Sequence, residues 1–304
     1  MMRRDHTFLS GGQLCAARLL TPDASNGPRP CIVMAQGGDG AGNARLGAFA
    51  KRFADAGIAA LIFDYRHFGD SEGEPRRLVD RDRQHDDWRA AINFARMLQG
   101  IDPRRLAVWG TSLSAGHVAT IAADNPEIAA AISQVPMVSG VSALRAAGAR
   151  TALRVALADL RDQVRRALGR PPSFIPLVGP PGSRAAMTSP DAEPGYHALF
   201  EPGEESRNEA TARGLLRLAA YRPVIRAPEI RCPWLVCVCD GDAITPPRPA
   251  VKAAARAPRG EIRHYDGGHF DIYVGPTFEI AVSDQVDFLR RHVLVDLPAT
   301  SRRK

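Results

Sequence analysis

Short runs of consecutive apolar residues alternate along the first part of the chain with longer stretches whose apolar positions repeat at helical spacing. The runs at 31–35, 59–63 and 106–109 contain no polar residue, which is typical of strands buried on both faces. The stretches between them, at 46–56 and 88–98, are long enough for helices. Strands that alternate with helices predict an α/β fold: a mostly parallel sheet with helices on both faces.

Further elements are predicted before and after this alternating part. Residues 6–20, with Gly11 and Gly12 near their centre, have the pattern of a two-stranded hairpin. The other predicted elements are a helix that ends near 123, a strand at 128–135, strands at 234–239 and 261–265, and a helix at 278–289.

The alternation of strand and helix patterns stops in the middle of the chain. Helical stretches at 144–168 and 208–220 flank a proline-rich segment at 171–181, and we find no strand pattern in this part of the sequence. We therefore predict a core and a mostly helical cap over the sheet's carboxyl edge. The core comprises residues 1–135 and 232–304, and the cap comprises residues 136–231.

Composition narrows the classes of protein to consider. The chain has 304 residues, of which 45% are hydrophobic and 24% are charged, as in ordinary globular proteins. Its apolar runs are too short to cross a bilayer and none follows the basic N-terminus, so we expect a cytoplasmic protein with no membrane partner. The net charge of +7 comes from scattered arginines without a binding motif, so we expect no nucleic-acid partner.

The cysteines do not indicate a cofactor. Their number, five, is odd, and together with the missing secretion signal this predicts free thiols. Cys237 and Cys239 are spaced for one face of a strand, and no second cysteine pair or histidine group completes a zinc pattern. We expect buried structural thiols and neither a metal nor another cofactor.

The strand at 106–109 leads directly into a turn of small residues. Ser112 has Gly110 two positions before it and Ser114 two positions after it, and a helical pattern follows. A serine on a sharp strand-to-helix turn needs small neighbours there, because the two backbones crowd together. Ser112 is therefore our candidate nucleophile. Ser114 also has small neighbours, but it would lie one turn into the helix.

A serine nucleophile requires a base and an acid that orients the base. His269 follows the last predicted strand, after Gly267 and Gly268, which allow the loop to turn back over the serine. Asp242 follows the strand at 234–239 and is our candidate acid; Asp240 competes, but it follows the strand directly and is better placed to close the turn. The order Ser, Asp, His along the chain is that of an α/β-hydrolase.

Two backbone N–H groups must stabilise the oxyanion that forms during acyl transfer. One is expected from Leu113, at the N-terminus of the helix after the nucleophile. We assign the other to Gly38, in the glycine-rich loop after the strand at 31–35. The same loop imitates a dinucleotide-binding fingerprint, but Asn43 stands where the third glycine belongs.

Two segments resemble one branch of the α/β-hydrolase superfamily. They are Phe63-Asp64-Tyr65-Arg66-His67-Phe68-Gly69-Asp70-Ser71 and Trp109-Gly110-Thr111-Ser112-Leu113-Ser114. The branch includes Xaa-Pro dipeptidyl-peptidase-like and serine-aminopeptidase-like hydrolases and fungal polyketide-processing hydrolases and acyltransferases. The resemblance implies Ser112, Asp242 and His269 as a catalytic triad. This chain has Gln36 where the family usually has histidine, and Ser114 where it usually has glycine.

The predicted activity is acyl transfer from a small-molecule ester, thioester, lactone or amide to water, through an acyl-enzyme on Ser112. For substrate binding we propose the cap residues Phe174 and Ile175, with Leu177 and Val178, although these residues could equally form the cap's own core. Two alternatives remain: an acyltransferase that uses another acceptor, and a binding module that no longer turns over. The sequence leaves the number of chains open, and a homodimer is the assembly that we consider.

Overall fold

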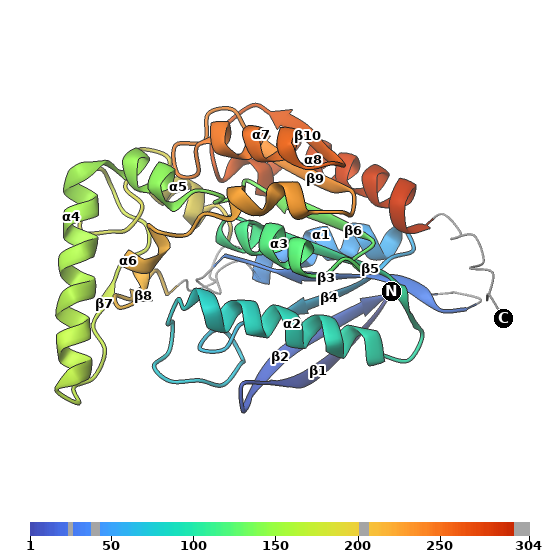
Figure 1. Cartoon of the computed structure of the whole chain (residues 1–304), viewed down its shortest axis with the longest axis horizontal. Helices are drawn as coiled ribbons and strands as arrows, with labels where there is room; N and C mark the ends of the chain where they lie inside the picture. The colour runs from blue at the N-terminus through green and yellow to red at the C-terminus, as the bar shows by residue number, and fades with distance from the viewer. Residues whose placement is uncertain (24–26, 38–42, 201–206, 295–304) are drawn as a thin grey trace.

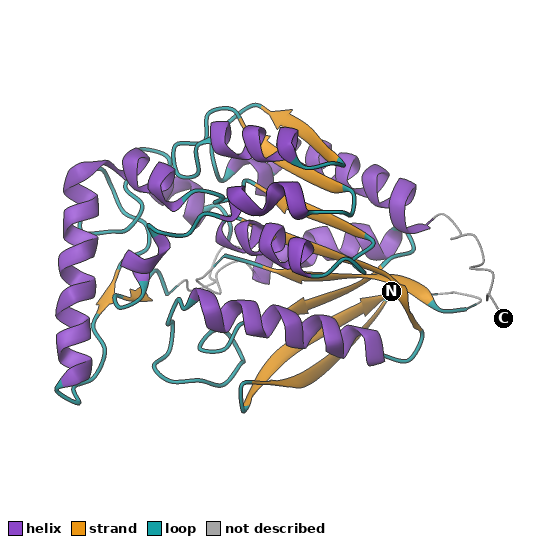
Figure 2. Ribbon diagram, in the orientation of Figure 1, coloured by secondary structure: helices purple, strands orange, loops and turns teal. Residues whose placement is uncertain are grey.

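An eight-stranded sheet forms the centre of the molecule in the computed structural model, which describes residues 1–23, 27–37, 43–200 and 207–294 (Figure 2). The strands are β1 (Met2–Ser10), β2 (Gln13–Thr21), β3 (Arg29–Ala35), β4 (Ala59–Phe63), β5 (Ile101–Thr111), β6 (Ala130–Gln134), β9 (Trp234–Cys239) and β10 (Gly260–Tyr265). Their order across the sheet is β1-β2-β4-β3-β5-β6-β9-β10. Pairing is parallel from β4 to β10, and the predicted hairpin adds β1 and β2 as an antiparallel edge.

Helices cover both faces of this sheet, which confirms the predicted α/β fold (Figure 1). One face carries α2 (Arg81–Met97), α3 (Leu113–Asp124) and α7 (Pro247–Arg256); the other carries α1 (Asn43–Asp55) and α8 (Gly275–Leu289). Successive residues of a central strand pack on opposite faces: Val33 and Val108 face one core, and Ile32 and Trp109 face the other. A strand buried in this way cannot carry polar positions, and this explains the uninterrupted apolar runs.

We call the segment 136–231 the cap segment. Most of its described elements lie beyond the carboxyl ends of the parallel strands, whereas its last one packs against α3 and α7 (Figure 1). It contains α4 (Gly140–Ala167), β7 (Phe174–Ile175), α5 (Ala192–His197), β8 (Ala210–Thr211), α6 (Leu215–Leu218) and the 3₁₀ helix η1 (Pro223–Glu229). The expectation that this part lacks strands was wrong, because β7 and β8 pair antiparallel. Each has only two residues, which is too short for an alternating pattern to be recognised.

All five cysteines are free and buried, as predicted. Short 3₁₀ and π-helical turns, η2 (Asp271–Tyr273) and η3 (Arg290–Leu294), flank α8. Within the described ranges, no helix combines the length and the apolar composition that a membrane span requires.

Candidate active site

Ser112 occupies a strained turn between β5 and α3. Its φ of 57° and ψ of −122° are unusual for a residue with a side chain, and its N–H donates to the carbonyl of Gln134 at 2.9 Å. The turn brings the preceding strand against the helix: a Cβ on Gly110 would lie 2.5 Å from the carbonyl oxygen of Ser114. Glycine at position 110 is therefore required by the close approach of the two backbones.

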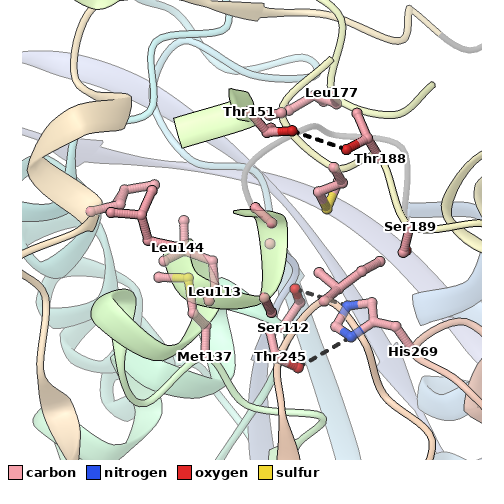
Figure 3. A pocket seen from close by; sticks show the side chains of 18 of the residues that line it. Ser112, Leu113, Met137, Leu144, Thr151, Leu177, Thr188, Ser189, Thr245 and His269 are labelled. Carbon is pink, nitrogen blue, oxygen red and sulfur yellow. Dashed lines mark hydrogen bonds between the residues drawn. The ribbon is translucent and has the colours of Figure 1, made fainter. Parts of the chain in front are cut away.

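Loops at the carboxyl ends of β5, β9 and β10 bring three polar side chains together. The Oγ of Ser112 lies 3.1 Å from the Nε2 of His269 (Figure 3). The Nδ1 of His269 lies 2.7 Å from the Oδ2 of Asp242, and both of these side chains are buried. The chain of hydrogen bonds runs from the carboxylate through the imidazole to the hydroxyl.

Asp242 is held by more hydrogen bonds than the sequence suggested. Its Oδ1 accepts the backbone N–H groups of Ile244 and Thr245, at 2.8 and 2.7 Å. Its Oδ2 accepts the hydroxyl of Thr245 at 2.7 Å. Burial alone would raise the pKa of Asp242, but the attraction of His269 and these hydrogen bonds outweigh it and hold the pKa below its usual value. The carboxylate is therefore ionised at neutral pH.

The two residues that compete with Ser112 and Asp242 in the sequence lie elsewhere. Asp240 is exposed, and its Oδ1 lies 2.7 Å from the Nδ1 of His264. Ser114 is fully buried, and its Oγ lies 2.5 Å from the hydroxyl of Tyr65. The indole N–H of Trp88 donates to the same tyrosine oxygen at 2.8 Å, so Ser114 belongs to the packing beneath α3.

Leu113 is the first residue of α3, where a helix offers no internal partner for the backbone N–H. The chain after β3 lies directly against this point: a Cβ on Gly37 would be 3.3 Å from the Cβ of Ser112 and 3.5 Å from the nitrogen of Leu113. Gly38, which we assigned as the second oxyanion donor, lies outside the described residues. The side chain of Gln36 faces the same region and lines the pocket described next.

Above Ser112 and His269 there is a pocket with a volume of about 490 Å³ (Figure 3). Most of its wall is apolar and comes from the cap segment. The larger apolar side chains that line it are Val79, Leu113, Met137, Leu144, Val155, Leu177, Met187, Leu199, Leu215, Leu216, Leu218, Ile244 and Phe270. Polar groups are few: Thr151 and Thr188, whose hydroxyls are 3.2 Å apart, and Ser189 lie on the cap side. The inner face of α4 forms much of this wall.

The structure places Phe174 and Ile175 away from this wall. Neither is among the described residues that line the pocket, whereas Leu177 is. The pairing of β7 with β8 fixes their orientation: the ring of Phe174 is partly exposed beneath the guanidinium of Arg77, and Ile175 is buried. Val178 likewise packs in the core next to the sheet. The sequence pointed to the proline-rich segment, but from that segment only Leu177 is among the described lining residues, whereas α4 contributes several.

A buried polar cluster joins the helix after Ser112 to the cap segment. The Nε2 of His85 and the Nδ1 of His117 lie 3.0 Å apart, and each is within 3.0 Å of the hydroxyl of Tyr221. The Nε2 of His117 lies 2.9 Å from the Oε1 of Gln84. Burial lowers the pKa of His85 to about 4 and that of His117 well below its usual value. Both imidazoles are therefore neutral at physiological pH.

The described residues do not suggest a cofactor site. Among them, no group of three or more His, Cys, Asp or Glu side chains is arranged to hold a metal ion. The carboxylate of Asp64, which a dinucleotide-binding site would turn towards a ribose, accepts the N–H of Asp70 at 3.1 Å within its own loop. The glycines at 38, 40 and 42 lie outside the described residues.

Comparison with known proteins gives a matching family, curated relatives and solved structures of similar fold. Residues 27–274 match the serine aminopeptidase S33 family. The quorum-quenching protein AidA of Acinetobacter baumannii is 44% identical over 96% of this chain and 95% of that protein. The polyketide transferase ATR5 of Stachybotrys chlorohalonatus is 27% identical over 96% of this chain and 98% of that protein. The crystal structure of the α/β-hydrolase GrgF from Penicillium superposes with a TM-score of 0.83 at 22% identity, covering 97% of this chain and all of that one.

Proposed function

The chain belongs to the serine aminopeptidase S33 family of α/β-hydrolases, and from this premise we propose that it hydrolyses an acyl substrate through an acyl-enzyme on Ser112. The observation that carries the proposal is the continuous set of hydrogen bonds from Asp242 through His269 to Ser112, at 2.7 and 3.1 Å. Such a set is what a hydroxyl needs to become a nucleophile at neutral pH.

In the first step, the Nε2 of His269 takes the proton of Ser112 as its Oγ attacks the substrate carbonyl. The ionised Asp242 stabilises the imidazolium that results and keeps Nδ1 as the donor. The N–H of Leu113 stabilises the negative oxygen, and we assign the second donor to Gly38. His269 then gives its proton to the leaving group, which departs and leaves an ester on Ser112.

In the second step, water attacks this ester while His269 takes a proton from the water. The imidazolium then returns this proton to the Oγ of Ser112 as the acid product leaves. An alcohol, amine or thiol in place of water would make the enzyme an acyltransferase. One relative is named a polyketide transferase, and this favours the second candidate. The same acyl-enzyme would serve both reactions, which differ only in the acceptor.

The pocket supports an apolar acyl group as the part of the substrate that is recognised. Its volume of about 490 Å³ falls within the range of sites for small organic molecules, and its wall is mostly aliphatic. The hydroxyls of Thr151, Thr188 and Ser189 could bind a polar substituent of the substrate. The carbonyl of a lactone is open to the same attack by Ser112 as that of an ester, so acylated lactones belong beside esters and thioesters in the set of substrates to test.

The test is a panel of esters, thioesters and N-acylated lactones of increasing acyl length, measured with the wild type, Ser112→Ala and Ser114→Ala. We expect Ser112→Ala to lower kcat/KM by at least about 10³-fold and to abolish labelling by a fluorophosphonate. Ser114→Ala is the matched control, because its hydroxyl bonds to Tyr65 and not to His269.

Three results separate the candidates. If Ser112→Ala is labelled and hydrolyses the panel like the wild type, Ser112 is not the nucleophile. If the wild type gives new acyl products when alcohols, amines or thiols are added, the enzyme is a transferase. If the wild type neither turns over any activated ester nor is labelled by a fluorophosphonate, the chain is a binding module, and the proposal of catalysis is wrong.

A further inference from the structure

The outer face of α4 carries a row of apolar side chains that the rest of the chain leaves uncovered. Leu153, Leu157, Leu160 and Val164 are 61, 57, 60 and 52% exposed. Their spacing of four, three and four residues places them on one face of the helix, as in a coiled coil. We call these residues the outer stripe. Contiguous exposed apolar side chains on a globular protein mark an interaction surface.

Hydrogen bonds fix the opposite face of α4 to the rest of the cap segment, so the outer stripe is not free to turn inwards. The carboxylate of Asp159 accepts the N–H groups of Gly214 and Leu216, at 2.8 and 3.0 Å. The buried carboxylate of Asp162 accepts the guanidinium Nε of Arg213 at 2.7 Å. Figure 1 shows α4 at the edge of the molecule, with the remaining elements on one side of it.

From these observations we infer that the outer stripe is a homodimer interface, in which α4 of one copy packs in parallel against α4 of a second copy. A row with four-three-four spacing is complementary to itself, because each side chain can insert between those of the same row on a partner. Two such rows, together with the aliphatic parts of the side chains beside them, bury on the order of 1,000 Å² of accessible surface. This area is the lower limit for a specific interface. The dimer is therefore expected to dissociate on dilution.

Charge selects the direction of packing. Arg154 and Arg161 follow one edge of the outer stripe, whereas Ala156 and Gln163 follow the other edge. An antiparallel pair brings like edges together and places Arg154 opposite Arg161 of the partner subunit. A parallel pair brings unlike edges together, so these guanidinium groups face alanine and glutamine. Arg150, which continues the row three residues before Leu153, then meets its own copy, so the parallel pair has one close contact between arginines where the antiparallel pair has two. The two copies are then related by a twofold axis along α4.

The interface acts on the proposed acyl site through the part of α4 that follows Gly148, where non-helical φ and ψ values of 81° and 157° kink the helix. Thr151 and Val155 line the pocket from the inner side of this part while the outer stripe faces the partner. Dimerisation therefore supports the pocket wall from outside. The inference does not depend on the chemistry at Ser112, since oligomeric state is measured without substrate.

Sedimentation equilibrium of the full chain over a range of concentrations tests the interface. We expect a monomer–dimer equilibrium, and we expect Leu157→Glu to weaken it by at least about 100-fold, because two apolar contacts are lost and two carboxylates are brought together. Ile280→Glu is the matched control: Ile280 is 58% exposed on α8, away from the stripe, and the variant should dimerise like the wild type. Thermal unfolding of both variants should show that each is folded.

Leu153→Cys tests the direction, because all five native cysteines are buried. In a parallel pair the two new thiols face each other, and mild oxidation should give a covalent dimer. In an antiparallel pair Leu153 faces Val164 of the other copy, which puts the thiols about 16 Å apart along the helix and prevents the bond. Failure to cross-link, with a wild-type dimer present, would overturn the parallel arrangement.

Salt distinguishes self-association from other partners. Each copy carries a net charge of +7, so shortening the Debye length from about 30 Å to 3 Å with salt should strengthen the dimer. A wild type that stays monomeric at every concentration overturns the inference. If that monomer floats with anionic lipid vesicles and salt releases it, the outer stripe binds a charged surface instead of a second copy.

Discussion

Replacing Asp242 by asparagine is the sharpest test of the triad, because the backbone fixes how the new amide must lie. The position of Oδ1 receives two N–H groups, from Ile244 and Thr245. An amide NH₂ cannot face two donors, so in the Asp242→Asn variant the amide oxygen takes the place of Oδ1. The NH₂ group then takes the place of Oδ2, at 2.7 Å from the Nδ1 of His269.

This arrangement reverses the tautomer of His269. With a donor opposite it, Nδ1 must accept a hydrogen bond, and the ring proton moves to Nε2. Nε2 is the atom that lies 3.1 Å from the Oγ of Ser112, so it no longer has a lone pair for the serine proton. We expect kcat to fall by about 10⁴-fold, which corresponds to about 5.5 kcal/mol of transition-state stabilisation.

The assay is steady-state hydrolysis of the best ester in the panel, with Asp240→Asn as the matched control. Asp240 is exposed and bonded to His264, so this variant should retain activity within about twofold, because an exposed ion pair contributes little. Thermal unfolding checks that both variants are folded. If Asp242→Asn retains more than a tenth of wild-type kcat, or Asp240→Asn loses as much, the role given to Asp242 is wrong.

Two further predictions concern the packing around the turn and the cap segment. Gly110→Ala would place a Cβ 2.5 Å from the carbonyl oxygen of Ser114, so we expect it to lower the free energy of unfolding by about 1–3 kcal/mol in urea titrations; unchanged stability would contradict this packing. Burial lowers the pKa of His85 to about 4 in the folded chain, whereas the unfolded chain has an ordinary value. Between pH 4 and pH 6.5 the unfolded chain therefore binds more protons than the folded chain. The free energy of unfolding falls as the pH falls through this range. His85→Gln keeps a donor near Tyr221 without titrating there and should make this decrease shallower by up to one proton, measured by urea unfolding across the range; an unchanged slope would show that His85 does not contribute.

The buried strands were predictable because burial on both faces leaves a direct mark on the sequence. The runs at 59–63 and 234–239 coincide with β4 and β9 to the residue. The helix α7 was missed, because Pro247 and Pro249 look like helix breakers, although proline is tolerated in a first turn. The start of α2 was placed too late, although Asp80 offered an N-cap signal: its side chain accepts two N–H groups of the first turn.

The site was predictable only where position along the chain determines position in space. Ser112, Asp242 and His269 each follow a parallel strand, and parallel strands end at one edge of the sheet, so their proximity could be expected. The contact between Tyr65 and Ser114 joins residues 49 positions apart and depends on how the loop after β4 packs against α3. The pocket wall depends on the packing of the cap segment, which no periodic pattern encodes.

The paired strands β6 and β9 are neighbours in the sheet, with Ala131 opposite Trp234, although the whole cap segment lies between them in the chain. The chain thus leaves the sheet at one strand and re-enters at the next, so an insertion at this point needs only two adjacent anchor points. The segment between these two strands can therefore be lengthened, shortened or exchanged, in evolution or by design, while the strand pairings on either side stay in register. Grafting the corresponding segment of a relative between Gln134 and Trp234 is therefore a direct route to enzymes with new acyl preferences on the same sheet.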